Sequence, residues 1–283
     1  MLTSILNGEP FLIAGPCALE TEEITLQVAA RLKTLSTSLE IPIVFKGSYA
    51  KSNRTSESSF HGIGLDLGLE WLKQVKQQFG LPVTSDVHEL DEIQPAAEVL
   101  DIIQIPSLLC KNTNLLHAAG ETGKIVNIKK GHFVTAEDMR CSLEKVTSRG
   151  NDKIMITERG TQFGYGDMIV DFRSIATLKS FGFPVIFDAS HSVRNTSRRS
   201  EDAAGGTPQS IPLLTRCAAA AGADGLFVET HPSPQDALCD AVSSYPLIEV
   251  EKLVRTFLDF QKFARQQDRL NSEESAATYI IKR

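Results

Sequence analysis

The chain has 283 residues, of which 42% are hydrophobic and 23% are charged, and its formal net charge is -6. This length is sufficient for one large α/β domain or two smaller ones. The acidic balance provides no positive surface for nucleic acid or for an anionic membrane, so we expect neither as a partner.

The first residues, MLTSILNGEP, lack a basic segment followed by an apolar one. No stretch approaches the roughly 18 consecutive apolar residues of a membrane helix. We therefore expect a cytoplasmic protein. The odd number of cysteines, their irregular spacing and the absence of a CxxC pair argue against a disulfide framework or a zinc finger. These cysteines are Cys17, Cys110, Cys141, Cys217 and Cys239.

One unit recurs along the chain: a short β-branched apolar run, a polar break and a longer amphipathic segment. The runs predict eight strands, at residues 11–15, 41–48, 82–87, 102–107, 125–130, 154–159, 185–190 and 225–230. Helical spacing is clearest at 22–35, 65–79 and 250–264. Because the alternation continues without a break in composition, it predicts an α/β fold, a single-domain (β/α)8 TIM barrel over residues 1–265. Residues 266–283 form a polar C-terminal tail in this interpretation, either disordered or docked on a neighbour.

An open doubly wound sheet is the alternative architecture. It would lead us to expect a glycine-rich dinucleotide or phosphate loop after an early strand. The segment GIGLDLG at 62–68 has the wrong spacing for such a loop, so the barrel is favoured.

Each predicted strand ends in a residue that can do chemistry. In a barrel of this kind the active site lies at the carboxyl ends of the strands, so these side chains are expected to converge on one mouth. The eight residues are Cys17, Lys46, Asp86, Gln104, Lys129, Arg159, His191 and Glu229.

Cys17, His191 and Glu229 follow strands one, seven and eight, which are neighbours in a closed barrel. Together with Asp240 on the following loop they offer sulfur, nitrogen and oxygen ligands, which suit Zn or Fe better than Mg or Ca. Spacing leaves two alternatives open. Cys17 can equally be a small buried hydrophobic residue, and His231 competes with His191 as the ligand.

Many cations also lie at the predicted mouth, in a protein that is acidic overall. Lys46 and Lys129 lie within apolar strands, where an ammonium without an anionic partner is costly. The cluster indicates substrates that carry phosphate and carboxylate groups, whereas Arg198 and Arg199 fit a solvated charge run. The set comprises Lys46, Lys51, Arg54, Lys129, Lys130, Arg159, Arg194, Arg198 and Arg199.

Several segments, in chain order, resemble those of the 3-deoxy-D-manno-octulosonate 8-phosphate synthases. They cover residues from about 11 to about 260 and are FKGSYAKSNRTS (45–56), TSDVHE (84–89), IIQIPSLL (102–109), VNIKKGHF (126–133), TERGTQFGYGDMIVDF (157–172), VIFDASHS (185–192) and LFVETHPSP (226–234). The resemblance implies a TIM-barrel transferase that condenses phosphoenolpyruvate with D-arabinose 5-phosphate, for 3-deoxy-D-manno-octulosonate and lipopolysaccharide biosynthesis.

The resemblance also implies roles for individual residues. Cys17 stands where metal-independent members carry Asn, so the sequence is similar to the metal-dependent class. The implied ligands of a divalent Zn, Fe, Mn or Co ion are Cys17, His191, Glu229 and Asp240. The residues implied to hold phosphoenolpyruvate are Lys46, Lys51, Gln104, Lys129 and Arg159. Those implied to serve the sugar phosphate are Asn53, Arg54, Thr55, Ser56 and Asp86, and Ser48 is a further substrate-binding residue. Lys46, Lys51, Asp86, Lys129 and His191 are the expected catalytic residues.

A homotetramer is implied as well, in which the Asn53-Arg54 segment of a neighbouring subunit completes the site. The sequence departs from the family pattern at Thr55, which replaces a common Ser, at Ala241, where Gly is frequent, and at Arg194, where Gln is usual.

Two rival functions remain. The related 3-deoxy-D-arabino-heptulosonate 7-phosphate synthases share the barrel but usually read KPRTS where this chain has Asn53 before Arg54. The other rival is a non-catalytic barrel that binds sugar phosphates, against which the complete ligand set and the lysines argue.

Overall fold

The computed structural model describes residues 1–52, 59–164, 166–198, 202 and 204–281, with side chains up to residue 268. The predicted sugar-phosphate residues Asn53, Arg54, Thr55 and Ser56 lie outside the described residues, as does Arg199. The strands are β1 (Phe11–Gly15), β2 (Ile43–Lys46), β3 (Val83–Asp86), β4 (Ile102–Ile105), β5 (Ile125–Lys129), β6 (Ile154–Glu158), β7 (Val185–Asp188), β8 (Gly225–His231) and β9 (Tyr245–Pro246). The α-helices are α1 (Leu2–Leu6), α2 (Glu22–Leu39), α3 (Leu65–Phe79), α4 (Ile93–Val99), α5 (Thr113–Glu121), α6 (Met139–Thr147), α7 (Arg173–Lys179), α8 (Ile211–Ala220) and α9 (Val250–Ile281).

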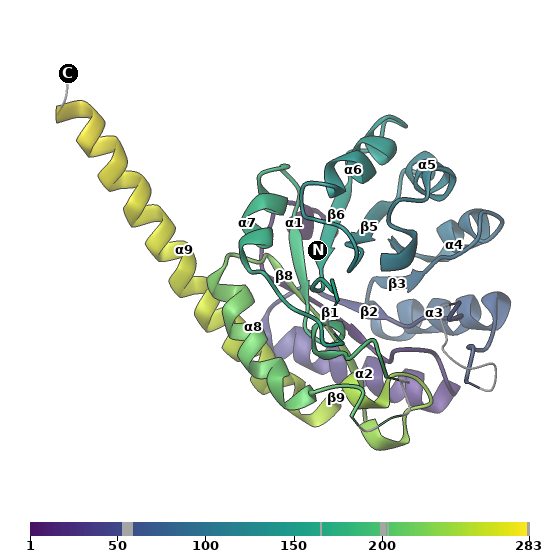
Figure 1. Cartoon of the computed structure of the whole chain (residues 1–283). Helices are drawn as coiled ribbons and strands as arrows, with labels where there is room; N and C mark the ends of the chain where they lie inside the picture. The colour runs from purple at the N-terminus through teal and green to yellow at the C-terminus, as the bar shows by residue number, and fades with distance from the viewer. Residues whose placement is uncertain (53–58, 165, 199–201, 203, 282–283) are drawn as a thin grey trace.

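Strands β1 to β8 are parallel, pair in sequence order and close into a barrel, with helices on the outside (Figure 1). Closure is made by β1 and β8, whose register runs from Phe11 opposite Gly225 to Gly15 opposite Glu229. Each predicted strand is present, and the (β/α)8 barrel is confirmed. The two-residue strand β9, which pairs with Thr230 and His231 beyond the barrel rim, was not predicted.

Side chains alternate between the inside and the outside of the barrel, as strand geometry requires. Phe11 and Ile13 of β1 pack inside with residues such as Met155 and Phe227, whereas Leu12 and Ala14 pack outwards against the helices. Helix α1 joins the inner cluster through Ile5, which is fully buried. The amino-terminal end of the barrel is thus closed by hydrophobic packing, and the carboxyl end is left for polar residues.

Local signals account for the helices that connect the strands. The hydroxyl of Thr21 accepts a hydrogen bond from the backbone N–H of Ile24 and so caps α2, whose first turn carries Glu22 and Glu23. Helix α3 ends at Gly80 in the left-handed conformation that favours glycine. Both helices cover the barrel with their apolar faces.

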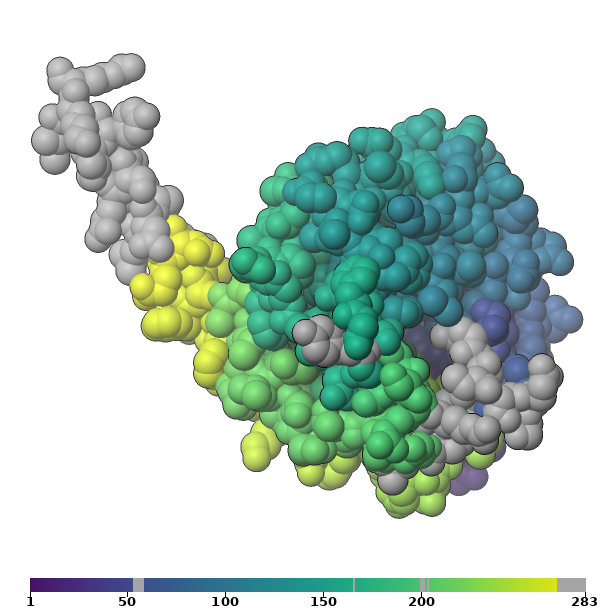
Figure 2. Space-filling view, viewed as in Figure 1, coloured from purple at the N-terminus to yellow at the C-terminus, as the bar shows by residue number. Residues whose placement is uncertain are grey.

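Helix α9 begins at Val250, where the sequence predicts it, and its backbone stays helical to Ile281. It leaves the rounded body of the barrel and projects from it (Figure 1), and in Figure 2 its yellow atoms emerge at the edge of that body. The division into a barrel up to residue 265 and a tail from 266 stays a prediction. Among the described residues, no helix combines the length and apolar character needed to span a membrane.

Candidate active site and metal centre

Cys17 reaches the barrel mouth through the turn that follows β1. A Cβ atom on Gly15 would lie 1.9 Å from the carbonyl oxygen of Lys46, so only glycine allows β1 and β2 to approach this closely. Cys17 is buried, and its Sγ lies 2.8 Å from Sγ of Cys239, 222 residues further along the chain. Burial, the Cys239 thiol and Glu229 raise the pKa of Cys17 well above its ordinary value. A metal ion that binds this thiol must therefore displace its proton.

Lys46 lies beneath the mouth and joins three strands. Its Nζ donates to the carbonyl oxygen of Cys17 at 2.6 Å and to Oε1 of Glu229 at 2.9 Å. The ammonium is almost completely buried, so the Glu229 carboxylate supplies the anionic partner that such a group requires.

Asp86, at the end of β3, is the centre of a polar layer inside the barrel. Its Oδ2 accepts from the hydroxyl of Ser48 at 2.6 Å, and its Oδ1 accepts from Nε2 of Gln104 at 2.7 Å. The chain of hydrogen bonds continues to Asn127 and Thr157 on the next two strands. Because successive strands are adjacent, polar residues at the same level meet side by side.

The charge state of Asp86 follows from the cations around it. Nζ of Lys46 lies 3.9 Å and Nζ of Lys51 lies 3.6 Å from its Oδ2. Burial alone would raise the pKa of Asp86, but these lysines and Lys129 hold it well below its ordinary value. Asp86 is thus ionised at neutral pH and can accept hydrogen bonds from hydroxyl groups or water.

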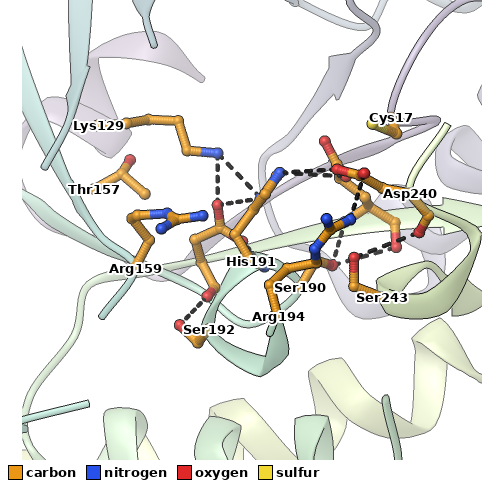
Figure 3. Close-up of polar contacts among 12 residues, drawn as sticks. Cys17, Lys129, Thr157, Arg159, Ser190, His191, Ser192, Arg194, Asp240 and Ser243 are labelled. Atoms are coloured by element: carbon orange, nitrogen blue, oxygen red, sulfur yellow. Dashed lines mark hydrogen bonds and ion pairs between the residues drawn. The ribbon is translucent and has the colours of Figure 1, made fainter. Parts of the chain in front are cut away.

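His191 lies between two groups of charged side chains (Figure 3). On one side its Nδ1 is 2.7 Å from Oδ2 of Asp188, which also binds Nζ of Lys129. On the other side its Nε2 faces Oε2 of Glu229 at 3.6 Å and Oδ2 of Asp240 at 3.7 Å. The pairing of Nδ1 with a carboxylate leaves Nε2 as the nitrogen available to a metal ion.

Within the part of the chain that the structure describes, two groups of potential metal ligands share Asp240. One consists of His191, Glu229 and Asp240 and the other of Cys17, Cys239 and Asp240, and within each group the ligand atoms lie within 4.8 Å of one another. Oε2 of Glu229 is buried and has no hydrogen-bond partner among the described residues. An unsatisfied carboxylate oxygen facing an imidazole nitrogen fits a cation, and the mixed donor set fits a transition metal.

A cavity of about 240 Å³ opens beside this cluster. Of the predicted residues it is lined by Lys51, Asp86, Lys129, Arg159 and His191; Ser52, His88 and the segment Pro106–Leu109 complete its wall. Nε of Arg159 is buried and has no hydrogen-bond partner among the described residues. The cavity is thus suited to a small polyanion.

Other predicted residues occupy different positions. Lys46, Gln104 and Glu229 are buried but do not line the cavity. Lys130 does not line it either, and its Nζ donates to the carbonyl oxygen of Gly160 at 3.1 Å. His231, the competing ligand, is 3.7 Å from Glu20 and bonds Ser233, so it does not belong to the cluster. His231 lies apart from the cluster because it follows Glu229, the last residue of β8 that pairs with β1.

The sequence reasoning missed Asp188, His88 and Cys239. Asp188 and His88 both lie in segments that the sequence predicts as strand ends. Because side chains alternate along an extended chain, His88 would have been predicted on the same face as Asp86, two residues earlier. Cys239 directly precedes Asp240, but no local pattern indicates that it meets Cys17.

The fold and the site together define a class: TIM-barrel enzymes whose mouth combines anion-binding cations with a cluster of potential metal ligands. The chain belongs to the DAHP synthetase I family, whose model matches residues 4–264. Curated relatives are named 2-dehydro-3-deoxyphosphooctonate aldolase. The relative in Desulfatibacillum aliphaticivorans is 49% identical over 259 residues, which cover 92% of this chain and 94% of the relative. The relative in Trichlorobacter lovleyi is 48% identical over 244 residues, which cover 86% of this chain and 89% of the relative. The relative of the same name in Syntrophotalea carbinolica is 49% identical over 252 residues (89% and 91%).

Proposed function

We propose that this chain condenses phosphoenolpyruvate with D-arabinose 5-phosphate and water to give 3-deoxy-D-manno-octulosonate 8-phosphate and inorganic phosphate. This is the reaction of the enzyme named in the curated relatives, and it serves 3-deoxy-D-manno-octulosonate and lipopolysaccharide biosynthesis. The observation that carries the proposal is the cavity in which Lys51, Lys129 and Arg159 lie next to the His191, Glu229 and Asp240 cluster. The enzyme works in the cytoplasm in this proposal.

The cations of the cavity bind and align the two anionic substrates. Lys51, Lys129 and Arg159 take the carboxylate and phosphate of phosphoenolpyruvate, because guanidinium and ammonium groups bind such oxygens through charge-assisted hydrogen bonds. Fixed cations offset the repulsion between two phosphorylated molecules and bring the reacting carbon atoms into contact. The Asn53-Arg54 segment of a neighbouring subunit completes the sugar-phosphate site in a homotetramer.

In the reaction, C3 of phosphoenolpyruvate attacks the aldehyde carbon of the sugar. Positive charge develops at C2, water adds there, and the phosphohemiketal loses phosphate by cleavage of the C–O bond. Asp86, held ionised by Lys46 and Lys51, accepts a hydrogen bond from a sugar hydroxyl or the attacking water and orients it. Lys129, fixed by Asp188 and by its position 4.2 Å from the centre of the Phe227 ring, offsets the negative charge of the phosphate as it leaves.

A divalent Zn, Fe, Mn or Co ion is held by Cys17, His191, Glu229 and Asp240 in this proposal. Such an ion supplies Lewis acidity toward the aldehyde oxygen or the water. The unsatisfied Oε2 of Glu229 supports the assignment, since it is a buried carboxylate oxygen without a hydrogen-bond donor among the described residues, whereas Oε1 of the same group accepts from Lys46.

One assay tests the function. Phosphate release is measured with phosphoenolpyruvate and either arabinose 5-phosphate or erythrose 4-phosphate, before and after chelation and after return of each metal. We expect turnover with arabinose 5-phosphate that chelation abolishes and a divalent metal restores. A preference for erythrose 4-phosphate would make the chain a heptulosonate synthase, and no turnover with either sugar would support a binding barrel. Full activity of metal-free protein would refute the metal proposal.

A further inference from the structure

The carboxylate of Asp240 contacts both Arg194 and His191. Its Oδ1 accepts a hydrogen bond from Nη1 of Arg194 at 2.5 Å, and its Oδ2 lies 3.7 Å from Nε2 of His191. Figure 3 shows Arg194 reaching Asp240 from the side of the 3-10 turn that carries His191. One oxygen is therefore occupied by the guanidinium, while the other faces the nitrogen that the proposed metal would bind.

The backbone of Asp240 is fixed independently of this side-chain contact. Asp240 has φ of 50°, a left-handed conformation that an aspartate tolerates better than most residues. Its carbonyl oxygen accepts hydrogen bonds from the backbone N–H groups of Ser243 and Ser244, each at 3.0 Å. The turn thus sets the position of the Cα atom, and the direction of the carboxylate depends on what its oxygens contact.

Arg194 is itself held firmly. Its carbonyl oxygen accepts from the N–H of Met168 at 3.1 Å, and Arg194 forms an antiparallel bridge with Gly206. On either side of Arg194, Thr207 donates to Val193 and Asn195 donates to Gly205. The side chain is mostly buried, with 12% of its surface exposed. A guanidinium anchored in this way can restrain the carboxylate that it binds.

We propose that Arg194 is a positioning residue for the metal centre: it holds Oδ1 of Asp240 so that Oδ2 points at the ion. This inference rests on the proposed metal site and adds to it a residue outside the ligand set. Hydrogen-bond partners of metal ligands typically contribute a factor of about 10 to 100 in metal affinity.

The charge of Arg194 would have the opposite effect on metal affinity. The guanidinium is a positive charge close to the proposed cation, so its removal would tighten metal binding if repulsion were its main influence. Arg194→Gln separates the two effects, because the glutamine amide still offers an N–H donor but carries no charge. If Arg194 acts by positioning Asp240, Arg194→Gln should preserve the metal affinity and Arg194→Ala should lower it.

The test is an equilibrium titration of the reduced, metal-free full-length protein with Co²⁺, followed by the absorption of the Co²⁺–thiolate bond. We expect a thiolate band in the parent protein, an affinity weakened about 10- to 100-fold in Arg194→Ala, and an affinity within about threefold of the parent in Arg194→Gln. Arg198→Ala is the matched control, since Arg198 is on the same segment but is 51% exposed and pairs with Asp202. Thermal unfolding of each metal-free variant verifies that it is folded.

The outcomes distinguish the proposals. Unchanged or tighter binding in Arg194→Ala would overturn the positioning role while leaving the metal site intact. Equal weakening in Arg194→Ala and Arg194→Gln would also overturn it, because an N–H donor at this position would then not account for the metal affinity. A parent protein without a Co²⁺–thiolate band would remove the metal site itself, and the role of Arg194 with it.

Discussion

The carboxylate of Asp188 pairs with Nδ1 of His191 at 2.7 Å and thereby turns Nε2 of the same ring toward Glu229 and Asp240. Asp188 also forms an ion pair with Lys129, so one buried carboxylate orients a potential metal ligand and an anion-binding lysine. This relationship connects the two halves of the candidate site.

Asp188→Asn is expected to lower activity about 10- to 100-fold, because the imidazole and the ammonium lose their common anionic partner. Initial rates with both substrates measure this effect. Asp171→Asn is the matched control, since Asp171 is 47% exposed and pairs with Arg173 outside the cavity. Parent-like rates in Asp188→Asn would show that neither contact matters for turnover.

Acid stability should also depend on Asp188. Burial alone would raise the pKa of this carboxyl, but His191 and Lys129 together hold it well below its ordinary value. Between the depressed native pKa and the unfolded value of about 4, the unfolded chain binds a proton that the native protein does not, so stability falls as the pH is lowered. We expect the free energy of unfolding to change less steeply between about pH 5 and pH 2 in Asp188→Asn. Urea titrations across this range measure the slope, and an unchanged slope would contradict the assignment.

Cys17→Asn should retain some activity and should no longer lose it on chelation, because Asn occupies this position in the metal-independent enzymes that the sequence resembles. Rates before and after chelator treatment provide the comparison. Cys141→Asn is the control, since Cys141 is exposed and should leave chelator sensitivity unchanged. A folded but completely inactive Cys17→Asn protein would argue against the equivalence.

Arg54→Ala should mainly raise the KM for arabinose 5-phosphate, because the resemblance assigns Arg54 to the sugar phosphate. Steady-state kinetics with each substrate varied in turn separate the two KM values. Arg140→Ala, at an exposed arginine on α6, should change neither value. An effect confined to phosphoenolpyruvate would show that the division of the cations between the substrates is wrong.

Lys130→Met is expected to lower the free energy of unfolding by about 3 to 5 kcal/mol, since it removes one partner of a buried ion pair. Lys130 Nζ lies 3.6 Å from Oε1 of Glu158, and both side chains are almost completely buried. Urea or thermal unfolding measures the loss. Lys145→Met, at a half-buried lysine whose Nζ donates to the carbonyl oxygen of Lys111, should cost much less, because it leaves no buried carboxylate uncompensated. A double variant with Glu158→Gln should recover part of the loss, because it removes the uncompensated charge.

The strands and the longest helices followed from the sequence because periodicity is a local property. Short β-branched apolar runs identified β1 to β8, and helical spacing located α3 at Leu65–Phe79. In such barrels the active site lies at the carboxyl ends of the strands, which all meet at the same edge. This predicted that Asp86, Lys129 and His191 would lie at one mouth. The resemblance supplied roles for these residues. It also assigned a role to Asn53 and Arg54, which lie outside the described residues.

Tertiary structure decided which of these side chains meet. His191 rather than His231 joins the candidate metal ligands because of the level at which β8 stops pairing with β1. Cys239 approaches Cys17 because of the way in which a loop folds back over the barrel. Lys129 and Lys130 are neighbours in sequence, yet one faces the cavity and the other is buried against Glu158. Such distinctions arise from strand register and side-chain direction, which are set by packing between distant segments, and a linear pattern does not contain them.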